Sequence, residues 1–443
     1  MRSGRARLLS LRFSALLLLL LGGGSGALPL PQPPPPARPG LDLVPTDRIL
    51  VLAPHPDDEV LGCGGLLQRA VSLHLPVEVA FLTYGDSNEG SFLAYRLHPV
   101  LRSSSVEKMG EMRRREALAA DALLGVPADR LTFLGYPDLG TLEIWQSHWA
   151  ARPPGHGPLT RARAVPYPTA LRPGAPYKGE EILTDLETVL ARFRPTRICV
   201  SHPADRHPDH VALYLFTRVA LWNLAGRVQA TLYPYLLHFP GWPARGYQPA
   251  VPEGAPAALG TAVAWQSWGL TPAEVEAKRR ALIAHRSQWH SGAHRLLPFA
   301  RATELTGDFP PLTLPAGEGA ALSVTGEGGL RLRLTRAGDR LRVELPPIPR
   351  LSLFAFGYRR DRPFGGIPKI EIRVEARSVA VLDQGKVLEK PGVTVERQTD
   401  RLVLGFPLAL LGDPERLLLA ARPPFGKGPS VRLPWRVIEL GGG

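Results

Sequence analysis

Short apolar runs alternate with longer amphipathic stretches between residues 48 and 296. The runs predict strands and the stretches predict helices, because buried strands are short and apolar whereas helices repeat their apolar positions about every 3.6 residues. Strands followed by helices favour a mostly parallel sheet with helices on both faces, so we expect an α/β, Rossmann-like domain over 48–296. The predicted strands are Ile49–Ala53, Val77–Thr83, 130–134 and Arg197–Ser201, and the predicted helices are 60–72, 106–124, 180–193 and 272–288.

A different pattern begins after about residue 297. Apolar and polar residues alternate one by one in several short runs, and Leu330, Leu332 and Leu334, for example, enclose Arg331 and Arg333. A period of two residues with Gly and Pro turns is typical of antiparallel sheets that have one solvated face. We therefore expect an all-β sandwich over 321–443, joined to the first domain by a linker over 297–320.

Four aromatic residues of the β region have two possible roles. They could fill the core of the sandwich, or they could stack on sugars and make the region a carbohydrate-binding module. These residues are Phe354, Phe356, Tyr358 and Trp435.

The first residues have the order of a secretory signal. Four arginines precede an apolar run over 13–21, and small residues follow up to Ala27. This order predicts a signal peptide over 1–27 and an exported protein. The run is shorter than the roughly 20 residues of a membrane span, although an uncleaved segment would hold the protein at a membrane. A Pro-rich linker is expected over 28–47.

Composition excludes several classes of protein. With 44% hydrophobic residues the chain is not disordered throughout, and two cysteines, Cys63 and Cys199, cannot build a disulfide framework or a cysteine-based zinc module. The net charge is +13, which by itself would favour nucleic acid. Cleavage after Ala27 would lower it to +9, and many arginines fall on solvent-facing strand positions, so we expect no nucleic-acid partner.

Ionisable residues concentrate in two segments, 53–59 and 202–210. The first follows the strand Ile49–Ala53, and the second follows the strand Arg197–Ser201. Ligands of open α/β sheets bind beyond the carboxyl ends of strands, so both segments are expected on one rim.

The types of residue in these segments are those of a catalytic zinc site. His55, Asp58 and His210 would supply three ligands and leave a position for water. Asp57 would then lie beside the metal as a general base. His207 could stabilise an oxyanion or protonate a leaving amine. Asp205 and Asp209 could orient the imidazoles.

Simpler interpretations remain open for the same residues. Either segment alone could be a turn in which an aspartate accepts backbone N–H groups at a helix start. Cys63 is expected as a buried structural thiol rather than a nucleophile. The histidines outside the two segments are expected on the surface or in the core; they include His74, His98, His148, His156, His238, His290 and His294.

The two segments, together with 60–65, resemble the motifs of the LmbE-like (PIG-L) zinc-dependent N-deacetylases. Further matches occur in order at 83–86, 134–138 and 285–288, so the resemblance covers about 48–290. It implies removal of an acetyl group from an N-acetylated amino sugar of the N-acetylglucosamine type. It also implies the same zinc ligands and base, and contacts of Arg113 and Asp138 with the sugar.

The substrate does not follow from this resemblance. The segments 88–105 and 152–176 are longer than a minimal member of the family needs, and we expect them to shape or cover the pocket. Two alternatives therefore stay open. The same metal site could hydrolyse another small amide or ester, or the chain could be a non-catalytic glycan-binding surface protein.

Overall fold

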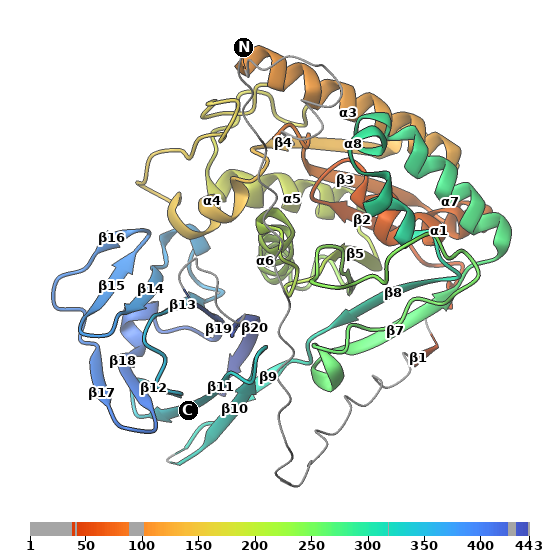
Figure 1. The fold of residues 1–443 in the computed structure, drawn as a ribbon. Coiled ribbons are helices and arrows are strands. Elements are labelled where there is room, and N and C mark those ends of the chain that lie inside the picture. Colours follow the sequence, from red (N-terminus) through yellow and green to blue (C-terminus); the bar gives the residue numbers. More distant parts are fainter. Residues whose placement is uncertain (1–37, 40–41, 88–101, 318, 424–430, 442–443) are drawn as a thin grey trace, which may run out of the picture. The chain divides into compact units, whose positions relative to one another are not determined.

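The computed structural model describes residues 38–39, 42–87, 102–317, 319–423 and 431–441 (Figure 1). These residues belong to one compact unit that extends from Pro34 to Gly443. The expected signal peptide and most of the Pro-rich linker lie outside the described residues. No helix within the described ranges is both long enough and apolar enough to cross a membrane.

The first sheet is mixed. Its strands are β1 Arg38–Pro39, β2 Ile49–Ala53, β3 Val77–Thr83, β4 Leu131–Tyr136, β5 Arg197–Ser201, β6 Thr231–Tyr235, β7 Ala264–Gly269 and β8 Thr303–Asp308, in the order β1-β7-β8-β6-β5-β2-β3-β4. Within the part β6-β5-β2-β3-β4, adjacent strands run parallel to each other. β8 is antiparallel to β6 and β7. The predicted α/β class is confirmed, and the parallel part of the sheet contains every strand predicted from the sequence.

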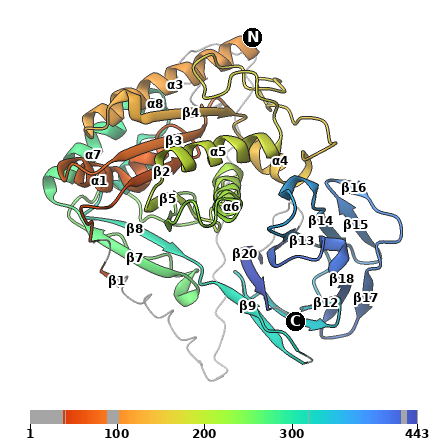
Figure 2. The same ribbon diagram turned by 180° about the vertical axis from the view of Figure 1, so that it is seen from behind.

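Helices flank this sheet in two groups. They are α1 Asp58–Ser72, α3 Ser103–Leu123, α4 Thr141–Ser147, α5 Gly179–Phe193, α6 Pro208–Asn223, α7 Pro272–Ala284 and α8 Arg286–Leu296. α1 and α3 pack with α7, whereas α4 and α5 pack with α6 (Figures 1 and 2). The predicted helix 272–288 ends at Ala284 and gives way to α8. The sequence reading missed α6 because this helix is apolar on nearly every side and has no amphipathic period.

The central strand β2 determines where a site can form. All five of its residues are buried, and it lies between β3 and β5. The chain leaves β2 through α1 to β3 on one side, and leaves β5 through α6 to β6 on the other side. The order of the strands therefore reverses between β2 and β5, which is where open α/β sheets form a ligand crevice.

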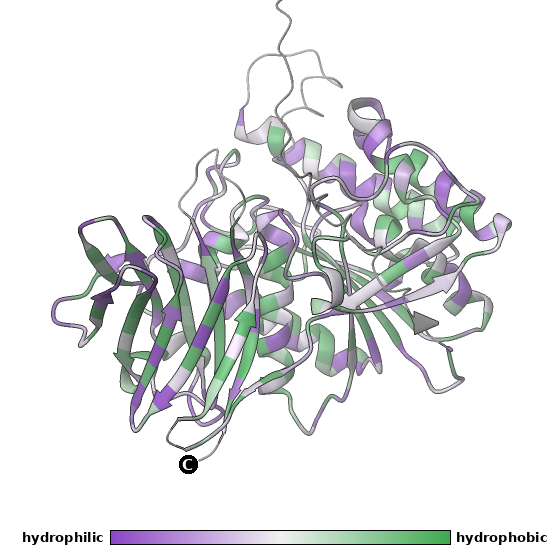
Figure 3. Ribbon diagram, turned by 60° about the horizontal axis from the view of Figure 1, so that its bottom comes forward, coloured by the Kyte–Doolittle hydropathy of each residue, from purple (hydrophilic) through white to green (hydrophobic). Residues whose placement is uncertain are grey.

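The β region consists of two further sheets, so the predicted all-β class is confirmed. One sheet has the order β10-β11-β12-β18-β17 and the other β16-β15-β14-β13-β19-β20-β9. Their strands are β9 Leu312–Leu314, β10 Ala321–Thr325, β11 Arg331–Ala337, β12 Arg340–Leu345, β13 Leu351–Tyr358, β14 Lys369–Val374, β15 Val379–Asp383, β16 Lys386–Val387, β17 Thr394–Arg397, β18 Leu402–Pro407, β19 Arg416–Arg422 and β20 Leu433–Leu440. Polar and apolar residues alternate along several of these strands (Figure 3). The segment expected as a linker, 297–320, contains β8 and β9.

β13 is buried along its whole length, on both faces. On one face Leu353 and Ala355 belong to the core between the two β sheets. On the other face Phe356 approaches Trp145 of α4, with ring centroids 5.9 Å apart. We call this second contact the aromatic layer; it comprises Trp145, Trp149, Phe216, Phe354, Phe356, Tyr358, Phe364 and Trp435.

The four aromatic residues of the β region therefore play neither of the two roles considered from the sequence. Phe354, Phe356, Tyr358 and Trp435 are at most 6% exposed, so they offer no platform for a sugar. They also lie outside the core of the sandwich and pack against the helices of the first sheet instead. A strand pattern of alternating residues could not reveal this, because both faces of the strand are covered.

Candidate active site

The carboxyl ends of five parallel strands bring the ionisable residues together. His55, Asp57 and Asp58 follow β2, Asp86 follows β3, Asp138 follows β4, the 202–210 segment follows β5, and His238 follows β6. The expected shared rim is thus present, and it lies at the reversal of strand order between β2 and β5.

Two imidazoles of this rim converge on one carboxylate oxygen of Asp58. Asp58 Oδ2 lies 3.0 Å from His55 Nδ1 and 3.1 Å from His210 Nε2. All three residues are buried, with 6%, 2% and 0% exposure for His55, Asp58 and His210. The structure therefore brings together the three residues that the sequence indicated as metal ligands.

Several overlapping sets among the described residues could hold a metal ion. Their ligand atoms lie within 4.8 Å of one another in each set. The sets are His55, His207 and His210; His55, Asp138, His207 and Asp209; and Asp58, His210 and His238. His55, His207 and His210 each occur in two of the sets, so the donors surround one small region.

The donors fit a cation on physical grounds. Both ring nitrogens of His210 are buried and make no hydrogen bond of good geometry with a described residue, although carboxylate oxygens of Asp58 and Asp205 lie 3.1 and 3.2 Å away. Burial lowers the pKa of His210, but Asp205 and Asp58 outweigh it and raise that pKa to about 9. A divalent cation would satisfy these carboxylates in place of the proton.

Asp57 has an unusual backbone conformation. Its φ is 128° and its ψ is −27°, a region that residues other than glycine rarely adopt. Its N–H donates to Glu59 Oε2 at 2.9 Å, and Arg113 Nη2 donates to Pro56 O at 2.7 Å and to Asp57 Oδ1 at 3.2 Å. These contacts hold the Asp57 backbone and its carboxylate in place next to Asp58 in the chain.

The protonation of Asp57 suits a general base. Burial raises the pKa of its carboxyl, the Arg113 guanidinium opposes this shift, and the resulting pKa is about 6. A base with a pKa near neutral pH combines a deprotonated state with useful proton affinity.

His207 is the N-cap residue of α6, and its ring and that of His55 make a T-shaped contact with centroids 4.5 Å apart. Its Nδ1 accepts a hydrogen bond from the Asp209 N–H at 3.3 Å. Burial lowers the pKa of His207 to about 4, and the charge of His55 acts in the same direction. A neutral ring that accepts at Nδ1 carries its proton on Nε2, so Nε2 is available as a donor.

The two aspartates expected to orient imidazoles do contact them. Asp205 Oδ2 lies 3.2 Å from His210 Nδ1, and its Oδ1 accepts the His207 N–H at 2.8 Å. Asp209 Oδ2 lies 3.2 Å from His55 Nε2 and accepts the Leu139 N–H at 2.6 Å.

Arg113 and Asp138 are both buried and contact other residues of the site. Arg113 is 4% exposed, and its Nη1 donates to Gly85 O at 2.7 Å in addition to its contacts with Pro56 and Asp57. Asp138 Oδ1 lies 3.2 Å from His55 Nε2. Their contacts with a sugar remain a prediction.

Sequence reasoning missed two residues of this rim, His238 and Asp86. The His238 ring lies 4.7 Å from that of His210, and the Tyr167 hydroxyl donates to Asp86 Oδ2. His238 follows a parallel strand, so the expectation that ligands bind beyond the carboxyl ends of strands would have indicated it as well. That strand, β6, contains Pro234 and was not recognised as a strand.

The loop over 152–176 approaches the same rim. Tyr167 is buried and stacks on Tyr84 with ring centroids 3.7 Å apart. Val165 is also buried. The loop is therefore packed against the first domain, next to Asp86.

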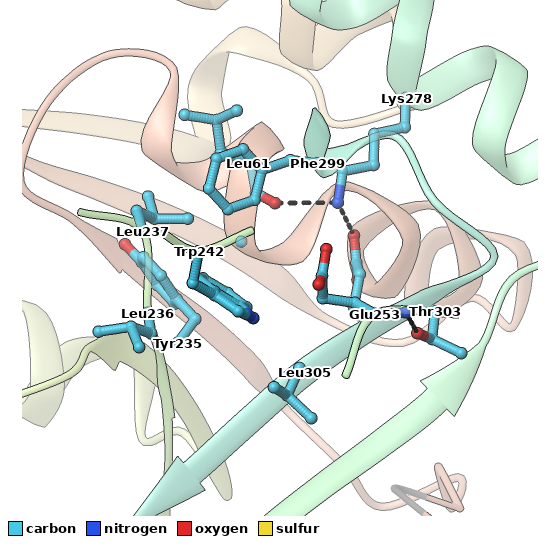
Figure 4. A pocket seen from close by; sticks show the side chains of 12 residues that line it. Leu61, Tyr235, Leu236, Leu237, Trp242, Glu253, Lys278, Phe299, Thr303 and Leu305 are labelled. Atoms are coloured by element: carbon cyan, nitrogen blue, oxygen red, sulfur yellow. Dashed lines mark hydrogen bonds and ion pairs between the residues drawn. The ribbon is translucent and has the colours of Figure 1, made fainter. Parts of the chain in front are cut away.

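A small cavity lies between α1, α7 and the strands β6 and β8 (Figure 4). Its volume is about 20 Å³, and Leu61, Tyr235, Glu253 and Lys278 are among its lining residues. A cavity of this size holds about one water molecule, so it cannot be the substrate site.

Residues 50–221 match the family model described as PIG-L: GlcNAc-PI de-N-acetylase. Residues 50–221 are therefore similar in sequence to the PIG-L family.

The chain also resembles several curated and solved proteins. The chain is 31% identical over 189 residues to the 1D-myo-inositol 2-acetamido-2-deoxy-alpha-D-glucopyranoside deacetylase 1 of Saccharopolyspora erythraea, covering 41% of this chain and 55% of that relative. It is 28% identical over 289 residues to the deacetylase of the same substrate from Corynebacterium urealyticum, covering 61% and 78%. The N,N'-diacetylchitobiose deacetylase structure from Pyrococcus horikoshii has 18% identity and a TM-score of 0.35, covering 55% and 70%. The chain thus spans about half the length of the first of these relatives.

Proposed function

We propose that this protein is a metal-dependent amide hydrolase that removes the acetyl group from an N-acetylated amino sugar. The observation that carries the proposal is the convergence of the donors His55, Asp58 and His210, with Asp57 next to Asp58 in the chain and held by Arg113. The relatives named above, which are deacetylases of an acetamido sugar, support this choice of substrate class.

His55, Asp58 and His210 would hold the metal. A bound divalent ion supplies Lewis acidity toward water and toward the acyl oxygen of the substrate. Zinc and export form part of the proposal. The mixed imidazole and carboxylate donors support zinc, and the basic, apolar and small-residue order over 1–27 supports export.

The residues of the chain move the protons. Asp57 takes a proton from the attacking water through its Oδ atoms, and Arg113 holds the carboxylate in place. The Nε2–H of His207 donates to the oxyanion that develops on the acyl group. Asp57 then returns its proton to the departing amine, so the products are acetate and the free amino sugar.

Substitution Asp57→Asn tests this mechanism. The variant loses the base but keeps the three metal donors, so we expect turnover to fall by about 10²–10⁴-fold while bound zinc stays unchanged. Acetate release from N-acetylglucosamine oligomers and elemental analysis measure the two quantities. Asp129→Asn, at an exposed carboxylate, is the control. Full activity of Asp57→Asn would rule out Asp57 as the base.

A further inference from the structure

The β region contacts the loop that carries the second group of site residues. Glu327 follows β10, and Arg432 directly precedes β20. The two residues form an isolated antiparallel bridge, with the Glu327 N–H donating to Arg432 O at 2.7 Å and the Arg432 N–H donating to Glu327 O at 3.3 Å. This bridge places both side chains on the same side of the β region.

Both side chains reach the loop over 203–206. Arg432 Nη2 donates to Ala204 O and, at 3.3 Å, to Asp205 O. Arg432 Nε donates to Glu327 Oε1 at 3.1 Å, and Glu327 Oε2 accepts from Arg206. The buried carboxylate of Glu327 thus contacts two guanidinium groups, that of Arg432 in the β region and that of Arg206 in the loop.

The position of this loop matters for the site because Asp205, which belongs to it, contacts both His207 and His210. Asp205 accepts the His207 N–H through Oδ1 and the Leu237 and His238 N–H groups through Oδ2. The same carboxylate lies 3.2 Å from His210 Nδ1. A shift of the Asp205 backbone would therefore move the imidazoles of His207 and His210 together.

We propose that Glu327 and Arg432 are positioning residues for the metal site. They hold the carbonyl groups of Ala204 and Asp205, so the β region forms part of the scaffold on which His207 and His210 are placed. The inference rests on the proposed function for its catalytic consequence. Its consequence for metal affinity does not depend on the identity of the substrate.

Three variants and one control test this inference. Arg432→Met removes the contacts with the two carbonyls, Arg432→Lys keeps a cation and part of the hydrogen bonding, and Glu327→Gln removes the charge that joins Arg206 to Arg432. Arg333→Met is the matched control, because Arg333 is about half exposed on β11 and pairs with Glu344 at 3.7 Å. The readouts are zinc affinity by competition with a chromophoric chelator, kcat and KM for acetate release, and thermal unfolding.

We expect Arg432→Met to weaken zinc binding by about 10–100-fold, as loss of groups that orient metal ligands does, and to lower kcat more than KM. Arg432→Lys should recover part of both effects, Glu327→Gln should act in the same direction as Arg432→Met, and Arg333→Met should change neither. Folded Arg432→Met with the zinc affinity and kcat of the wild type would overturn the inference. If Arg432→Met fails to fold, wild-type zinc affinity in both Arg432→Lys and Glu327→Gln would overturn it.

The two proposals fail in different ways. If the wild type releases no acetate while the Arg432 variants still lose zinc, the positioning role stands and the proposed function falls. If acetate release by the wild type is normal and zinc affinity is unchanged in the Arg432 and Glu327 variants, the proposed function stands and the positioning role falls.

Discussion

At the scale of single residues, the strained conformation of Asp57 is the main feature of the site. A positive φ in a residue other than glycine costs of order 1–3 kcal/mol and persists only where neighbours enforce it. Here Glu59 holds the Asp57 N–H, and Arg113 holds the preceding carbonyl and the carboxylate. The strain is therefore maintained by residues that need not touch substrate.

Arg113→Met should shift the pH profile of the enzyme. Arg113 lowers the pKa of Asp57 against the effect of burial, so its removal raises that pKa. A base must be deprotonated to act, and the acid limb of kcat/KM against pH should therefore move to higher pH, with a lower plateau because the carboxylate loses its orientation. Arg114→Met is the control, since Arg114 pairs with Glu111 at 2.9 Å. An unmoved acid limb would contradict the assigned contact.

The sequence allowed the candidate metal donors and the aspartates beside their imidazoles to be predicted, but not the contact that holds Asp57. His55, Asp58 and His210 lie close to a recognisable strand end, so a rule about strand ends finds them. Arg113 lies in the middle of α3, far along the chain, and its contact with Asp57 depends on how α3 packs. No local pattern contains that information.

At the scale of elements, the packing of α1 determines where His55 and Asp58 lie. Gly62 allows the helix to approach β6, because a Cβ there would lie 2.6 Å from the Tyr235 ring. Lys278 of α7 donates from Nζ to Leu61 O of α1 at 2.9 Å (Figure 4). The same Nζ pairs with Glu304 Oε1 of β8 at 2.7 Å. Glu304 in turn accepts the Gly65 N–H at 2.7 Å, so a buried ion pair anchors the helix.

Gly62→Ala should destabilise the fold. The added methyl group meets a fully buried ring that cannot withdraw, so we expect the free energy of unfolding to fall by about 1–3 kcal/mol. Gly269→Ala is the matched control, because a Cβ at Gly269 would meet no atom within 4 Å. Urea denaturation followed by circular dichroism measures both. Equal stability of the two variants would refute the close approach of α1.

The elements themselves were predictable where their own residues form an apolar run or an amphipathic repeat. β2, β3 and β5 have the bounds that their apolar runs indicated. β8 escaped prediction because Thr303–Asp308 is largely polar, and its place beside β7 and β6 depends on pairing with distant strands. Pairing of this kind leaves no signal in a short window of sequence.

At the scale of the whole molecule, the aromatic layer joins the β region to the helices of the first sheet. Lys369 of β14 lies within this contact. Its Nζ lies 5.0 Å from the centre of the Trp149 ring and 4.0 Å from that of Phe364, and it donates to Phe364 O and Ile367 O at 2.6 Å. The side chain is 1% exposed.

Lys369 should make the stability of the protein depend on pH. Burial lowers the pKa of its ammonium from 10.5 to about 7 in the folded chain. Between these values the unfolded chain binds a proton that the folded chain lacks, so the free energy of unfolding rises with pH across this window. In Lys369→Met that rise should be smaller, as measured by urea denaturation at pH 7 and pH 10. The exposed Lys386→Met is the control, and identical slopes for all three proteins would contradict the burial effect.

The aromatic layer also has a practical consequence for protein engineering. A shortened protein that ends before β10 would leave Trp145 without Phe356 and Trp435, and Trp149 without Phe364. Contiguous apolar patches of this kind promote self-association. A catalytic half prepared alone therefore calls for polar substitutions at Trp145 and Trp149.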